Sequence, residues 1–102
     1  MKNSIITEFV KITVPETTTM EQLTAKADRL NDFLKIQDGF IDAELVKYTE
    51  GNTWCFIYHY ENLEKVKAIG EKLRNSKLFD EITPLIVPGS VNVTFCRRLK
   101  NW

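Results

Sequence analysis

The stretch Thr53–Tyr60 constrains the fold more than any other part of this chain. It contains four of the eleven aromatic residues and the only histidine in the sequence. Because side chains alternate along a strand, the aromatic rings share one face, which carries Trp54, Phe56, Tyr58 and Tyr60. The other face carries Cys55, Ile57 and His59. A strand that is apolar on both faces belongs in the middle of a sheet, with protein packed over each side.

Hydrophobic periodicity predicts a regular order of elements around this stretch. Strands are predicted over residues 5–14, 40–48, 53–60 and 90–99, and helices over residues 18–38 and 62–75. One further helical turn is predicted over residues 77–82, closed by Pro84. In the first strand, Glu8 shares a face with Ile6, Val10, Ile12 and Val14. No linker or repeat interrupts the order, so residues 1–102 are predicted to form a single domain.

The first helix has recognisable signals at both ends. Thr18 and Glu21 have the spacing of a capping box, and Asp38–Gly39 ends the helix and turns the chain. An apolar stripe runs between these signals at spacings of three and four, formed by Met20, Leu23, Ala27, Leu30 and Leu34. Such a stripe is typical of a helix that packs on a hydrophobic core.

A glycine interrupts the apolar stripe of the second helix. Asn62 is a suitable N-cap, and the stripe consists of Leu63, Val66, Ile69 and Leu73. A glycine inside a helix costs about 1 kcal/mol relative to alanine. The presence of Gly70 therefore indicates that another group packs close to the helix backbone. Either a ring of the protein itself or a bound ligand can come close to the backbone there.

The turn at Glu50–Gly51 sets the pairing of the second and third strands. The predicted pairs are Leu45 with Phe56, Ala43 with Tyr58, Ile41 with Tyr60, and Asp42 with His59. Directly opposed side chains share a face. The aromatic rings therefore join an apolar row on the second strand, whereas Asp42 and His59 meet on the opposite face.

This order of elements is the βαββαβ arrangement of the ferredoxin-like α+β fold. Right-handed crossovers place both helices on one face of a four-stranded antiparallel sheet, and the aromatic row is predicted to lie on that covered face. The first strand then separates the strands that carry Cys55 and Cys96. Two strand spacings exceed the reach of a disulfide, so both cysteines are predicted to be reduced thiols.

The other face of the predicted sheet, called here the uncovered face, is too apolar to stay in water and too polar for an ordinary core. It carries Thr7, Phe9, Glu44, Val46, Cys55, Ile57, Thr94 and Cys96. We expect a second copy of the chain to cover it, which makes the protein a homodimer.

Charge and composition narrow the range of partners. Fourteen Lys and Arg residues balance fourteen Asp and Glu residues, so no broad field attracts nucleic acid or an anionic membrane. One His and two separate cysteines fit no metal-ligand spacing. Residues 54–57 mimic the aromatic spacing of an RNA-recognition motif, but the basic residue and glycine that precede it there are missing. The sequence has no signal-peptide core and no membrane-length apolar run, which favours the cytoplasm.

Several short motifs along nearly the whole chain carry a resemblance to a known family. They are the first strand, Gly39–Phe40–Ile41 with Glu44–Leu45, Tyr58–His59–Tyr60, Glu61–Asn62–Leu63, and Leu78–Phe79. With these motifs the chain resembles the antibiotic-biosynthesis-monooxygenase-like group of the dimeric α/β-barrel superfamily. The resemblance implies paired ferredoxin-like sheets that form a barrel, a pocket between sheet and helices, and oxidation of an aromatic substrate by oxygen without metal, flavin or other cofactor.

A haem-degrading branch of the same group is an alternative that the sequence disfavours. The resemblance implies, for that branch, a Trp at the end of the third strand, a haem-ligating His after the second helix, and an Asn in the first strand. This chain has Tyr60, Thr83 and Phe9 at the matching positions.

Two functions remain open. One is a cofactor-independent monooxygenase acting on a small aromatic or quinone-like metabolite, and the other is a non-catalytic dimeric module that binds a ligand or a partner. The substrate-binding candidates are Trp54, Phe56, Tyr58, Tyr60, Gly70 and Phe79. The catalytic candidates are Tyr58, Tyr60, His59 and Asp42; in the last pair the carboxylate raises the basicity of the imidazole. The predicted register puts His59 and Asp42 on the opposite face from the rings, so the two sets cannot serve one site.

Overall fold

The chain folds in the α+β order βαββαβ, as its sequence predicts. The computed structural model describes residues 4–102, so residues 1–3, with which the predicted domain begins, lie outside the described part. The strands and helices are β1 (Ile6–Thr13), α1 (Met20–Leu34), β2 (Phe40–Lys47), β3 (Thr53–Tyr60), α2 (Leu63–Ser76) and β4 (Asn92–Arg97). Two 3₁₀ turns, η1 (Phe79–Glu81) and η2 (Thr83–Leu85), lie between α2 and β4.

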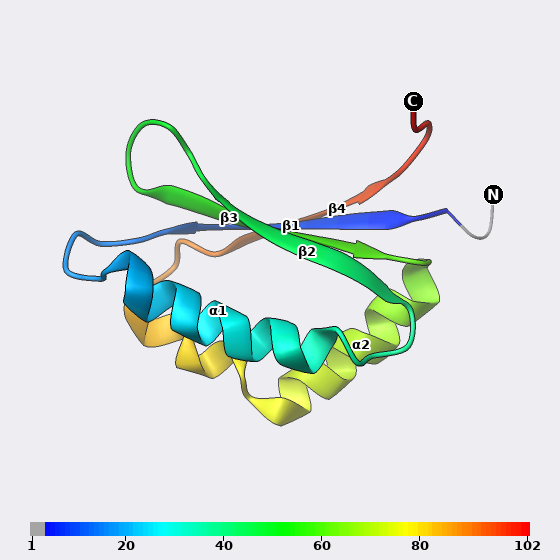
Figure 1. Cartoon of the computed structure of the whole chain (residues 1–102), viewed down its shortest axis with the longest axis horizontal. Coiled ribbons are helices and arrows are strands. Elements are labelled where there is room, and N and C mark those ends of the chain that lie inside the picture. Colours follow the sequence, from blue (N-terminus) through cyan, green and yellow to red (C-terminus); the bar gives the residue numbers. More distant parts are fainter. Residues whose placement is uncertain (1–3) are drawn as a thin grey trace.

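The four strands form one antiparallel sheet in the order β2-β3-β1-β4. Both helices lie on one side of it, and the other side is uncovered (Figure 1). The predicted ferredoxin-like topology is therefore confirmed. As predicted, β1 separates Cys55 from Cys96, and both are free thiols.

The predicted hairpin register holds over most of β2 and fails at its start. The confirmed pairs are Leu45–Phe56, Ala43–Tyr58 and Asp42–His59. An irregularity between Phe40 and Asp42 makes Phe40, rather than Ile41, the partner of Tyr60. The extra residue of such a bulge reverses the alternation of faces. The Phe40 ring therefore contacts the Tyr60 ring, with centroids 5.7 Å apart, while Ile41 is exposed.

The hydrophobic core lies between the sheet and the helices. Its largest fully buried side chains are Ile12, Leu23, Leu30, Leu34 and Ile82. The 3₁₀ turns close one end of the core, because the Val87 N–H donates to the Thr13 carbonyl (2.9 Å) and Thr18 Oγ1 donates to the Leu85 carbonyl (2.8 Å). Trp54 pairs with Ile12 at this closed end.

Two of the predicted helix signals lie elsewhere in the structure. The capping box of α1 is formed by Thr19 and Gln22, not by Thr18 and Glu21, because the hydroxyl of Thr18 is engaged by the η2 backbone. Pro84 does not close a single helical turn; it lies inside η2, the second of two 3₁₀ turns. The predicted N-cap of α2 is confirmed, since the Asn62 side chain accepts from the Lys65 N–H (3.0 Å).

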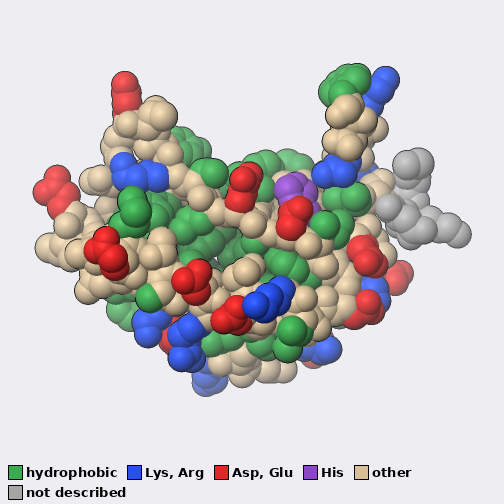
Figure 2. All heavy atoms as spheres, in the orientation of Figure 1, with side chains coloured by type: hydrophobic (Ala, Val, Ile, Leu, Met, Phe, Trp, Pro, Cys, Tyr) green, Lys and Arg blue, Asp and Glu red, His purple; other side chains and the backbone are tan. Residues whose placement is uncertain are grey.

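The surface reflects the two layers of the fold. Figure 2 shows acidic and basic side chains interspersed over the helical half of the molecule, with hydrophobic side chains exposed toward the sheet. Within residues 4–102, no helix is long and apolar enough to cross a membrane.

Candidate functional site

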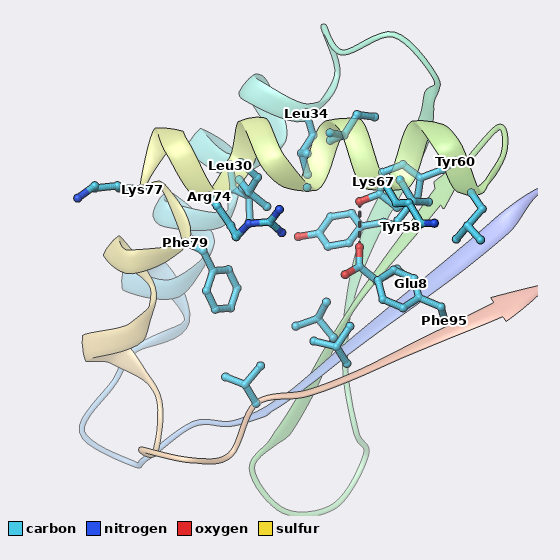
Figure 3. Close-up of a pocket in the computed structure, with 18 of the residues that line it drawn as sticks. Glu8, Leu30, Leu34, Tyr58, Tyr60, Lys67, Arg74, Lys77, Phe79 and Phe95 are labelled. Atoms are coloured by element: carbon cyan, nitrogen blue, oxygen red, sulfur yellow. Dashed lines mark hydrogen bonds between the residues drawn. The ribbon is translucent and has the colours of Figure 1, made fainter.

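A cavity of about 690 Å³ lies between the helix-covered face of the sheet, the two helices and η1 (Figure 3). Its size is within the range of pockets that hold small organic ligands. Most of its walls are apolar, formed by Val10, Leu30, Leu34, Leu63, Val66, Ile69, Leu73, Phe79, Val91, Val93 and Phe95. Its lining includes Phe79 and Asp80 of η1 and no residue of η2.

The cavity exists because α2 does not pack over β4 on the helix-covered face of the sheet. Val93 and Phe95 of β4 lie on its wall and are about half exposed. Gly70 lines the wall on the α2 side, and a Cβ built on it meets only the Arg74 side chain, at 3.6 Å. Of the two readings of Gly70, a ring of the protein filling the space is therefore excluded, and the backbone faces the cavity.

A carboxylate at the sheet side of the cavity is its most unusual group. Glu8 projects from β1 between the core residues Ile6 and Val10 and is partly buried. Tyr60 Oη donates a hydrogen bond to Glu8 Oε1 at 2.9 Å, drawn as a dashed line in Figure 3. Burial raises the pKa of Glu8, and the hydrogen bond from Tyr60 opposes this only in part. A carboxyl whose pKa is raised in this way is a stronger base than an exposed one and suits proton transfer.

The two tyrosines of the cavity act as neutral hydrogen-bond donors. Burial raises the pKa of both Tyr58 and Tyr60 well above the usual range, and the nearby Glu8 charge raises it further. Tyr60 donates to Glu8, whereas the Tyr58 hydroxyl has no hydrogen-bond partner among residues 4–102. Figure 3 shows the Tyr58 hydroxyl pointing along the cavity toward Arg74. Its proton is therefore available to a ligand oxygen.

The structure assembles part of the predicted binding set in one place. Tyr58, Tyr60, Gly70 and Phe79 all line the cavity. Trp54 and Phe56 were also expected there, but both are buried in the core and neither reaches the cavity. Trp54 and Phe56 belong to the buried core together with Ile82 and Ile86 of the segment that follows α2, whereas the Tyr58 and Tyr60 end of the aromatic row borders the cavity.

The predicted histidine pair forms, but away from the cavity. His59 Nδ1 and Asp42 Oδ1 lie 2.6 Å apart on the uncovered face. The sheet itself separates the pair from Tyr58 and Tyr60, as the register predicts. Within residues 4–102, no group of three or more His, Cys, Asp or Glu side chains could hold a metal ion.

Sequence reasoning missed five polar residues of the cavity. They are Glu8, Lys67, Arg74, Lys77 and Asp80. For Glu8 a signal existed, because it interrupts the apolar face of the first strand. The residues on α2 and η1 gave none, since charged residues at a helix edge are ordinary solvent-facing positions.

No protein-family model and no curated protein matches the sequence. Solved structures do match. SnoaB, a cofactor-independent oxygenase from Streptomyces nogalater, is 12% identical with a TM-score of 0.80, over 96% of each chain. The monooxygenase from the gene ActVA-Orf6 of Streptomyces coelicolor, in complex with the ligand nanaomycin D, is 14% identical with a TM-score of 0.80, over 99% of this chain and 92% of that one.

A third match is a Caulobacter crescentus protein provisionally described as an antibiotic biosynthesis monooxygenase. It is 13% identical with a TM-score of 0.80, over 97% of this chain and 93% of that one. The structural neighbours are thus of the antibiotic biosynthesis monooxygenase type, the type that the sequence motifs resemble. At these identities the similarity establishes the shared fold.

Proposed function

We propose that the protein is a cofactor-independent monooxygenase for a small aromatic or quinone-like metabolite, which binds in the cavity between sheet and helices. The observation that carries the proposal is the Glu8 carboxylate, hydrogen-bonded to Tyr60 inside a largely apolar cavity. Apolar walls suit a fused aromatic ring, and a carboxylate with a raised pKa is the base that activates such a ring.

The first step is removal of a proton from the substrate. With an anthrone as the example, Glu8 takes a proton from the activated ring CH₂ group, and the resulting anion is delocalised onto the anthrone oxygen. Tyr58, with its free hydroxyl, donates a hydrogen bond to that oxygen, and the Arg74 guanidinium adds positive charge at the same end of the cavity. Donors aimed at the developing charge lower the barrier.

Oxygen then reacts with the anion directly. The anion transfers one electron to O₂, and the two radicals combine with formation of a C–O bond, which gives a hydroperoxide after protonation by Glu8. Loss of the remaining C–H proton and cleavage of the O–O bond release water and leave a carbonyl group. The substrate supplies all the electrons, so CH₂ and O₂ become C=O and H₂O with no further reductant.

The structural neighbours support this proposal by analogy. SnoaB is described as a cofactor-independent oxygenase, and the ActVA-Orf6 monooxygenase is described with a bound ligand, nanaomycin D. Fold similarity alone does not define a reaction. The support for the reaction itself comes from this chain, in the cavity and its Glu8 carboxylate.

Oxygen uptake with dithranol, a hydroxylated anthrone, tests the proposal. In the presence of a metal chelator and without added flavin, we expect one O₂ to be consumed per quinone formed, and one atom of ¹⁸O₂ to enter the product. Binding of dithranol without oxygen uptake above the enzyme-free rate would instead support the non-catalytic ligand-binding module and would refute the oxygenase.

A further inference from the structure

One face of α2 presents two cations to the cavity. Lys67 and Arg74 line it together with Gly70, at spacings of three and four along the helix, and Lys77, the residue that caps α2, lies beyond them. Figure 3 shows Arg74 turned into the cavity toward Tyr58, and Lys77 at the rim, turned outward. Because Gly70 has no side chain, the space beside the Arg74 guanidinium stays open.

These three cations have no acidic partner of their own. Within residues 4–102, Lys26 and Arg29 pair with Glu81, and Lys65 pairs with Asp38, but no ion pair involves Lys67, Arg74 or Lys77. Among the described residues that line the cavity, Asp80 is the only acid on the α2 and η1 side. Arg74 is therefore a guanidinium turned into a largely apolar cavity without an ion pair to that acid.

The charges are arranged unequally along the cavity. Figure 3 places Glu8, Tyr60 and Lys67 at one end of the cavity, and Arg74 and Lys77 toward the junction of α2 and η1, the turn that contains Asp80. An anionic group on a ligand is repelled by Glu8 and attracted by Arg74, whose planar guanidinium can donate two hydrogen bonds to a carboxylate. A neutral hydroxyl group fits the Glu8 and Tyr60 end.

We infer that the cavity selects aromatic hydroxy acids, with the carboxylate held by Arg74 beside the Tyr58 hydroxyl, and with the oxygenated ring placed at Glu8. The inference deepens the proposed function, on which it rests for the assignment of the cavity as the substrate site. It predicts both a substrate class and an orientation.

Anaerobic equilibrium titration tests the inference without any turnover. The probe is 6-hydroxy-2-naphthoic acid, in which hydroxyl and carboxylate lie at opposite ends of a fused ring, and the control ligand is its methyl ester. We expect the acid to bind at least about tenfold more tightly than the ester at low salt. Added salt should weaken binding of the acid and leave that of the ester unchanged.

Charge-removing variants locate the anion site. Arg74→Gln should weaken binding of the acid about tenfold and leave the ester unaffected. Lys77→Gly provides a second variant with a secure fold, because Lys77 has a left-handed backbone (φ 60°) that glycine adopts more readily. Lys72→Gln is the matched control, since Lys72 is on the same helix but does not line the cavity.

Equal affinity for the acid and the ester would overturn the inference, as would equal losses in Arg74→Gln and Lys72→Gln. These results are separable from the proposed function. Oxidation of neutral dithranol without any preference for the acid would support the proposed oxygenase function and refute the inference that the substrate is an aromatic hydroxy acid. A preference for the acid without oxidation of either probe would leave the anion site standing and refute the oxygenase.

Discussion

Glu8 is the residue on which the chemistry of the cavity depends. It stands where β1 would otherwise carry an apolar side chain, and burial of a carboxylate costs free energy that the single hydrogen bond from Tyr60 offsets only in part. Its position on the core face was evident from the strand alternation alone. Its role was not, because the alternation does not tell whether a cavity lies above the strand.

The stability of the protein should depend on pH through Glu8. Its pKa in the folded state lies above the ordinary value of 4.5, so the folded protein binds this proton more tightly than the unfolded chain. Stability is therefore lost as pH rises from about 4.5 through the folded-state pKa. Glu8→Gln removes this loss. The difference in Tm, variant minus wild type, should therefore increase with pH over that interval when thermal unfolding is measured.

A difference in Tm between Glu8→Gln and the wild type that is constant with pH would contradict a raised pKa for Glu8. Glu71→Gln serves as the control, because Glu71 is exposed on α2 and its replacement should give no such pH-dependent gain.

Tyr60→Phe should move the pH dependence of oxidation. The Tyr60 hydrogen bond lowers the pKa of Glu8, so its removal raises that pKa further and shifts the acidic limb of the pH–rate profile to higher pH. A hydrogen bond to a charged group is worth about 1.5–3 kcal/mol, so the displacement of the acidic limb should be measurable in a pH–rate profile.

The companion variant Tyr58→Phe retains the bond between Tyr60 and Glu8. It should lower the rate by about tenfold or more and leave the acidic limb in place, because it removes only a donor to the substrate oxygen. Wild-type rates in both variants at every pH would remove these phenols from the mechanism.

At the scale of elements, α2 shapes the cavity more than any strand does. The sequence predicts this helix, its cap and the unusual position of Gly70, and all three are confirmed. An apolar stripe does not specify the angle at which a helix crosses a sheet. Because Val93 and Phe95 face a cavity only at the angle that α2 adopts, the cavity itself could not be predicted from periodicity.

Gly70 offers a test of this geometry. Gly70→Ala should stabilise the helix by about 1 kcal/mol, because the new methyl group has only ordinary contact with Arg74 at 3.6 Å. Gly70→Leu should extend into the cavity and raise the KM for dithranol about tenfold or more. The matched control is Ala68→Leu, which adds the same side chain at an exposed position of α2. Equal KM values in the two leucine variants would show that Gly70 does not border the substrate.

The errors in the predicted elements have local causes. The bulge at the start of β2 exchanges Phe40 and Ile41, and the hairpin argument assumed an unbroken alternation from the turn to the strand end. Gly39 precedes the bulge with φ +94°, and its backbone packs against the Lys65 side chain so closely that a Cβ would overlap it. A contact with a residue that far along the chain cannot be read from local pattern.

At the scale of the whole molecule, the order of elements was sufficient to predict the topology. Chirality rules leave few alternatives once two helices and four strands are placed. The division of the aromatic row into a core end and a cavity end was not predictable, because it depends on residues 77–91. Two buried isoleucines there, Ile82 and Ile86, belong to the core without any regular spacing that would mark them.

We propose that a second copy of the chain covers the uncovered face. Phe9, Val46 and Ile57 remain partly accessible on it, and a depression of about 230 Å³ lies between residues that include Phe9, Tyr48 and Cys55. The C-terminal tail extends away from the helices in Figure 1 and carries Trp102, which is 98% exposed. An apolar sheet face with an exposed aromatic beside it suits a self-complementary interface.

Light scattering after size exclusion should give about twice the chain mass of 11.9 kDa at micromolar concentration. Ile57→Lys should give the monomer mass, because it places a charge in the middle of the face. Ile36→Lys is the matched control, since Ile36 is 76% exposed outside the sheet, and it should remain dimeric. A wild-type monomer under these conditions would contradict the proposal.

The central claim is that Glu8 is the base of a cofactor-independent oxygenation inside the cavity. The most direct measurement compares the maximal rate of dithranol oxidation by the wild type and by Glu8→Gln, with anaerobic titration to establish that both bind the substrate. We predict a loss of about 10²-fold to 10⁴-fold in rate with affinity retained, the range typical of a lost general base. A rate for Glu8→Gln within about threefold of the wild type would contradict the claim.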